Sequence, residues 1–187
     1  MRFVFISLIL VSASLASIST AVADPYVGFG VGTASYKADL TASSGNEIDD
    51  DGTGTKLYGG YAFNKYFAAE ASVYNFAEAS VGAVETSPGG PVVSGSVSMK
   101  GVAAYVVGMY PVTKNVNLMA KLGVLNWDAD LRVGDTTRTN DGTDMAYALA
   151  ASYAFTKELL VAAEWESFNS DNPELSMLSL GFKFIFK

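Results

Sequence analysis

Large apolar residues alternate with small or polar ones along most of this chain, and the alternation is clearest near its C-terminal end. Within residues 175–186, every second position is large and apolar: Leu178, Leu180, Phe182, Phe184 and Phe186. The positions between them are small or polar, apart from Ile185. A period of two places the two sets on opposite faces of a β-strand. This stretch therefore predicts a strand with one wholly apolar face.

The same period predicts seven further strands and no helix, over residues 26–36, 55–63, 66–76, 98–110, 116–127, 144–155 and 158–168. The connections alternate between long polar segments (37–54, 77–97, 128–143 and 169–174) and short turns (64–65, 111–115 and 156–157). That alternation is typical of an antiparallel up-and-down barrel. Strands of this length cross a bilayer when tilted, and closure of the last strand on the first leaves no unpaired edge in lipid. We therefore expect an all-β, eight-stranded antiparallel transmembrane barrel.

The face opposite the apolar one carries charges of both signs, which we expect to point into the lumen: Lys56, Glu70, Lys100, Lys121, Glu164, Glu166 and Lys183. In the strand over residues 98–110, the apolar outer face is assigned to Met99, Ala103, Tyr105, Val107 and Met109. Charges of opposite sign in a narrow interior should neutralise one another, because an unpaired buried charge is expensive. The resulting network has two interpretations: ion pairs that plug the barrel, or a gate on a narrow ion path.

Two further patterns fit a membrane barrel. Aromatic residues near the predicted strand ends predict two interfacial girdles: Tyr26, Tyr36, Phe63, Tyr66, Phe76, Tyr110, Trp127, Phe155, Phe168 and Phe186. Glycines at positions 28, 30 and 32 share the inner face of the first strand. They leave room in a crowded lumen for long side chains from the opposite strands.

The N-terminal segment, residues 1–23, is predicted to be a secretory signal. Arg2 gives a positive start, an apolar run follows, and Ala21-Val22-Ala23 has the small residues of a cleavage site. The barrel domain would then comprise residues 24–187.

Composition excludes several kinds of chemistry. The chain has a formal net charge of −7, which disfavours nucleic-acid binding, and it has no cysteine and no histidine. Disulfides, thiolate metal sites and Ser-His or Cys-His catalysis are therefore absent. The acidic run from Glu47 to Asp51, followed by Gly52, resembles half of a calcium loop, but the closing position holds Tyr58 instead of a carboxylate. We interpret it as a solvated acidic loop and expect no metal, no cofactor and no enzymatic activity.

Three segments are similar to one known family: residues 110–127 (YPVTKNVNLMAKLGVLNW), 153–159 (YAFTKEL) and 177–181 (MLSLG). They resemble the tyrosine-turn-strand repeats and the closing strand in the membrane domain of the OmpA family of Gram-negative outer-membrane proteins. The resemblance implies an outer-membrane location with both termini in the periplasm. It also implies contact with outer-membrane lipid and lipopolysaccharide, a monomeric state, and an assembly signal in Phe182, Phe184 and Phe186 that the barrel-assembly machinery recognises.

The chain departs from that family in two respects. Larger members continue into a peptidoglycan-binding domain, whereas this sequence ends at Lys187, so we expect no cell-wall tether. Members close a lumenal gate with acid-base pairs, and the place where the resemblance implies a basic residue is held by Ala162, while Glu164 is kept. We therefore expect the gate to be formed by a different set of ion pairs or to be absent.

Two functions remain open at this stage. The first is a small structural barrel that contributes to envelope integrity or to surface contacts through its loops. The second is a narrow channel for ions or small solutes, controlled by the lumenal charges. An enzyme acting on lipid or peptide and a soluble lipid-carrying barrel are both disfavoured, the first by the missing histidine and the second by the outward apolar faces.

Overall fold

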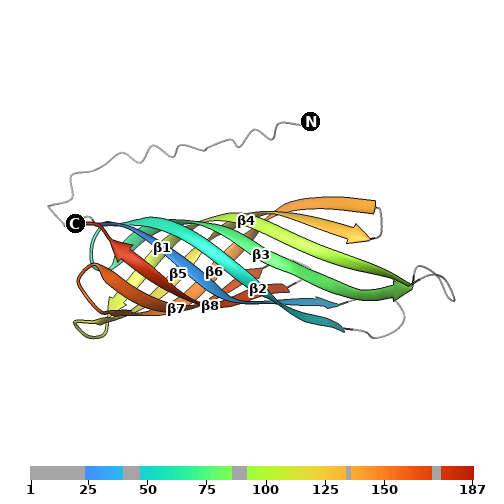
Figure 1. Ribbon diagram of the computed structural model, residues 1–187. Helices are drawn as coiled ribbons and strands as arrows, with labels where there is room; N and C mark the ends of the chain where they lie inside the picture. Colours follow the sequence, from blue (N-terminus) through green and yellow to red (C-terminus); the bar gives the residue numbers. More distant parts are fainter. Residues whose placement is uncertain (1–23, 40–46, 86–91, 134–135, 170–173) are drawn as a thin grey trace.

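The computed structural model describes residues 24–39, 47–85, 92–133, 136–169 and 174–187, and the predicted signal segment 1–23 lies outside this part. The described residues form a closed barrel of eight tilted antiparallel strands in sequence order (Figure 1). This confirms the predicted fold class. The strands are β1 (Asp24–Asp39), β2 (Glu47–Ala62), β3 (Phe67–Glu85), β4 (Val92–Pro111), β5 (Val116–Val133), β6 (Thr136–Ala154), β7 (Leu159–Asn169) and β8 (Glu174–Ile185).

The barrel closes where β8 pairs with β1. Their register runs from Tyr26 opposite Ile185 to Lys37 opposite Glu174. Beyond the last ladder pair, the Phe186 N–H donates to the carbonyl oxygen of Pro25 at 2.8 Å. The first and last strands therefore begin and end at the same end of the barrel, which is also the end of the three short turns and is called the turn end below.

The three short turns are built alike. In each, the side-chain oxygen of Asn64, Thr113 or Thr156 accepts two backbone N–H groups two and three residues later, at 2.7–3.2 Å. These are local turns of the kind that Asn and Thr side chains favour. A lysine follows each of the three residues, at positions 65, 114 and 157. The turn end therefore carries a repeated basic residue.

The outer wall of the barrel is apolar, as the alternation predicts. The exposed large aliphatic and aromatic residues of its middle include Val27, Phe29, Val31, Leu57, Val73, Val102, Val106, Leu118, Leu122, Val124, Met145, Leu149, Leu178, Leu180 and Phe182. An exposed apolar surface that encircles a barrel is suited to lipid. No helix within the described ranges is long and apolar enough to cross a membrane.

The predicted orientation of β4 is wrong. Ala103, Tyr105 and Val107 are buried in the lumen, while Val102 and Val106 face outward. Both faces of this strand are apolar, so alternation alone did not determine which one meets the lipid. Lys100, which had been expected inside, is exposed on the outer face.

Aromatic residues do encircle the turn end on the outside: Tyr61, Phe63, Tyr66, Phe67, Tyr110, Tyr153, Phe155, Phe184 and Phe186. The prediction of two girdles was wrong for several members, because Tyr26, Phe76 and Phe168 are buried inside and Trp127 packs partly buried against the core. Their positions in the pleat direct them inward, whatever their distance from the strand end. The side chain of Tyr36 lies outside the described part.

Much of three predicted loops is strand instead. At the end opposite the turns, called the loop end below, β3 and β4 extend to Glu85 and Val92, and β5 and β6 extend to Val133 and Thr136 (Figure 1). Backbone hydrogen bonds continue to pair these strands, although their sequences do not alternate between apolar and polar residues. A part of the sheet that extends beyond the bilayer does not contact lipid, so it does not need an apolar face. The second strand likewise starts at Glu47, within the predicted acidic loop.

Glycine permits close approach at the closing seam. Gly181 of β8 lies opposite Gly30 of β1. A Cβ added at Gly181 would overlap the carbonyl oxygen of Phe29. By contrast, a Cβ at Gly108 of β4 would first meet a backbone oxygen of Ala120 at 3.8 Å, an ordinary contact. The seam therefore requires a residue without a side chain, whereas β4 tolerates a methyl group at Gly108.

Candidate functional site

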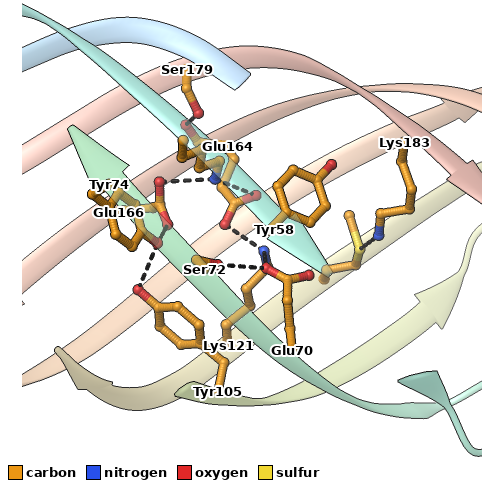
Figure 2. Close-up of polar contacts among 12 residues, drawn as sticks. Tyr58, Glu70, Ser72, Tyr74, Tyr105, Lys121, Glu164, Glu166, Ser179 and Lys183 are labelled. Atoms are coloured by element: carbon orange, nitrogen blue, oxygen red, sulfur yellow. Dashed lines mark hydrogen bonds and ion pairs between the residues drawn. The ribbon is translucent and has the colours of Figure 1, made fainter. Parts of the chain in front are cut away.

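Five charged side chains from four strands meet in the lumen, and Figure 2 labels four of them, Glu70, Lys121, Glu164 and Glu166. Lys56 lies on β2, Glu70 on β3, Lys121 on β5, and Glu164 and Glu166 on β7. Each is at most 4% exposed. The alternation of each strand directs these side chains inward, and the narrow barrel brings them together.

Four ion pairs join these five residues into one chain, called the lumenal ion-pair network below. Lys121 Nζ lies 2.6 Å from Glu70 Oε1 and 2.6 Å from Glu164 Oε1. Lys56 Nζ lies 2.9 Å from Glu164 Oε2 and 2.9 Å from Glu166 Oε2. Glu164 is therefore the central carboxylate, because each of its oxygens faces a different lysine.

Hydroxyl groups complete both ends of the network. Tyr26 donates to Glu70 Oε2 at 2.9 Å, and Tyr74 donates to Glu166 Oε1 at 2.6 Å. Tyr74 and Tyr105 share a further hydrogen bond of 3.1 Å. None of these three tyrosines was predicted from the sequence to be a member of the network. The alternation along each strand could have indicated their direction, because Tyr26 and Tyr74 are each separated by an even number of positions from the inward-facing residues of their strands.

An aromatic layer covers the network on the side of the loop end. The rings of Tyr74 and Phe76 stack at 5.5 Å, and Phe168 packs edge-on against both, at 5.5 and 6.0 Å. Leu125 and Met177 are fully buried nearby in the same core. Apolar packing excludes water from this part of the lumen, which strengthens the electrostatic interactions below it.

The seventh predicted charge, Lys183, lies in the lumen but outside the network. It is 6% exposed, and its Nζ contacts Met119 Sδ at 3.7 Å and lies 4.3 Å from the ring centre of Tyr26. In Figure 2 it stands apart from the joined carboxylates. Six of the seven predicted lumenal residues therefore point inward, and Lys100 does not.

The proposed assembly residues lie on the outer wall. Phe182 and Phe184 lie on the outward face of β8, Phe186 follows directly after the strand and is also exposed, and the last two belong to the turn-end aromatic belt. Their rings are accessible from outside, so their recognition by another molecule stays a prediction. Within the described ranges, no group of three or more Asp, Glu, Cys or His side chains is arranged to hold a metal ion.

An apolar outer wall and an interior crossed by hydrogen-bonded ion pairs define a membrane barrel whose lumen is blocked at its centre by side chains. The chain belongs to the outer membrane protein beta-barrel domain family, whose model matches residues 3–186. This membership shows the OmpA-like outer-membrane class that the sequence resemblance predicts, and it places the protein in the outer membrane.

Outer membrane protein A of Escherichia coli O157:H7 is 25% identical over 170 residues, which cover 86% of this chain and 47% of that protein. The chain thus spans about half the length of this relative. Two solved structures share the fold. Neisserial surface protein A has a TM-score of 0.62 at 15% identity and covers 87% of this chain and 97% of its own. Ail, the attachment invasion locus protein of Yersinia pestis, has a TM-score of 0.57 at 18% identity, with coverage of 87% and 99%.

Proposed function

We propose that the protein is a small structural outer-membrane barrel with a closed lumen, which contributes to envelope integrity or to surface contacts through its loop end. The observation that carries the proposal is the lumenal ion-pair network. Each oxygen of Glu164 lies within 2.9 Å of a lysine, and the aromatic layer of Tyr74, Phe76 and Phe168 covers the network. An interior filled in this way stabilises the barrel and leaves no continuous water path.

The turn end would face the periplasm and the extended β3–β6 strands the cell exterior. Short turns at the periplasmic side and long extensions outside are the usual arrangement of outer-membrane barrels. The exposed polar residues of the β5–β6 extension, among them Arg132, Arg138 and Asp141, would then be the surface presented to the environment. The proposed partners are outer-membrane lipid, lipopolysaccharide and the assembly machinery, and we expect a monomer.

A narrow channel is the second candidate, favoured by a cavity that extends from the turn end to Lys183. In a channel, only the ion-pair network and the aromatic layer would separate this cavity from the loop end. The lysines and glutamates of the network would then act as a switchable barrier.

Single-channel recording distinguishes the two candidates. The mature barrel would be refolded in detergent, shown to be folded by its heat-dependent gel shift, and placed in a planar bilayer. A structural barrel is silent, and its Glu164→Ala and Lys121→Ala variants lose stability without gaining conductance. Reproducible steps in the wild type that change with either substitution would establish the channel instead.

A further inference from the structure

The lumen contains a cavity of about 290 Å³ at its turn end, called the vestibule below. Its inner end is formed by Tyr26, Met119 and Lys183, and Asn64 and Lys65 line it at the turns. One water molecule occupies roughly 30 Å³ in the liquid, so the vestibule has room for a small molecule together with several waters. The lumenal ion-pair network lies beyond its inner end.

Lys183 is a buried cation without a carboxylate partner. Among the described residues, no Asp or Glu oxygen lies within 4.0 Å of its Nζ, although Lys56 and Lys121 each have two such partners. Its contacts are the Met119 sulfur, a weak acceptor, and the face of the Tyr26 ring. An ammonium group has three donors, so these contacts leave hydrogen-bonding capacity unused at the wall of the vestibule.

Other donors line the same cavity. Ser152 carries a hydroxyl and Asn117 a side-chain amide, and both belong to the vestibule wall. The two charged residues nearer the opening, Asp24 and Lys65, are of opposite sign. Their charges offset one another, which leaves Lys183 as the remaining charged side chain in the lining of the vestibule.

We propose that the vestibule binds a small oxyanion, a carboxylate or a phosphate, with Lys183 as the charged anchor and Ser152 and Asn117 as further hydrogen-bond donors. An anion at this place would give Lys183 the direct ion pair that it lacks, because the network's three carboxylates, which outnumber its two lysines by one, make their ion pairs with Lys56 and Lys121. The site lies on the turn side of the network, so it exists whether or not the lumen conducts. A silent barrel can bind the anion, and a conducting barrel can fail to bind it.

Backbone NMR of the refolded, isotope-labelled barrel in detergent micelles tests this proposal, with inorganic phosphate and, separately, acetate replacing chloride at constant ionic strength. We expect saturable shifts of the amide signals of Lys183, Met119 and Ser152. Lys183→Met should weaken the binding about tenfold or more, because it removes the charged hydrogen bond and keeps the length of the side chain. Lys114→Met, at an exposed turn outside the lining of the vestibule, serves as the matched control and should retain the saturable response.

The proposal is overturned if the wild-type shifts rise linearly with phosphate and acetate, or if Lys183→Met gives the same saturable response. Shifts confined to the turns around Lys65, Lys114 and Lys157 would indicate anion binding to surface lysines and would also overturn it. If Lys183→Met does not refold, the same titration of Ser152→Leu tests the proposal, because the larger side chain fills the vestibule and leaves Lys183 in place. Saturation that persists in Ser152→Leu contradicts the assigned site, and loss of saturation supports it.

Discussion

Glu164 Oε1 lies 2.6 Å from Lys121 Nζ, which joins β7 to β5 inside the barrel. The other oxygen of Glu164 pairs with Lys56 of β2 at 2.9 Å. One carboxylate therefore connects three strands that are not neighbours in the wall. The remaining two members, Glu70 and Glu166, each depend on one of these lysines for an ion pair.

Replacing Glu164 by glutamine should lower the free energy of unfolding by about 1–3 kcal/mol, because it removes two of the four buried ion pairs and leaves Lys56 and Lys121 with one carboxylate each. Urea unfolding of the refolded barrel in detergent, followed by tryptophan fluorescence, measures the change. The matched control is Glu158→Gln at an exposed turn, where Lys187 is 4.0 Å away, and the expected change is within about 0.5 kcal/mol. Equal effects of the two substitutions would contradict a central role for Glu164.

The closing seam should reject a methyl group at Gly181. The added Cβ would overlap the backbone of Phe29, and we expect Gly181→Ala to destabilise the barrel by about 1–3 kcal/mol. Gly108→Ala has space for its methyl group and should remain near the wild type. The two variants are compared by the fraction of each protein that still shows the heat-dependent gel shift after treatment with increasing concentrations of urea. A wild-type response from Gly181→Ala would show that the seam can relax.

Residues on opposite faces should differ in their access to a thiol reagent, and the cysteine-free sequence makes this measurable. Lys100 is exposed, whereas Lys121 is 4% exposed in the lumen. We expect Lys100→Cys to react with a water-soluble maleimide in the folded barrel and Lys121→Cys to react only after unfolding. Both variants should label fully in the denatured state, which controls for reagent and yield. Rapid labelling of Lys121→Cys when folded would mean that the lumen is open.

The outer wall should be sensitive to charge at the middle of a strand. Leu180 lies about midway along β8, is 63% exposed and pairs with Val31 and Ala163. Leu180→Arg should cost about 2–4 kcal/mol when the barrel is folded into lipid vesicles, because the charge would lie in hydrocarbon. Asn140→Arg, on the exposed β6 extension, should fold as the wild type does. Similar folding of the two variants would contradict the assignment of this surface to lipid.

The sequence determines the wall of this barrel better than its interior. Alternation correctly directs Lys56, Glu70 and Glu164 inward, because one face of each of their strands is clearly polar. It fails for β4, where Val106 and Val107 leave both faces apolar and Lys100 lies near the loop end, where a charge is tolerated on either face. Which lysine meets which carboxylate depends on the stagger between strands, and a single strand does not contain this information.

The ladder between Tyr26 and Ile185 also constrains the order of events during folding. The first strand completes its hydrogen bonds only when the last one is in place, across almost the whole length of the chain. Such distant contacts fold slowly, because most of the loop entropy is lost before they form. A chain truncated before Glu174 would therefore be unable to close its barrel, however well its first seven strands pair.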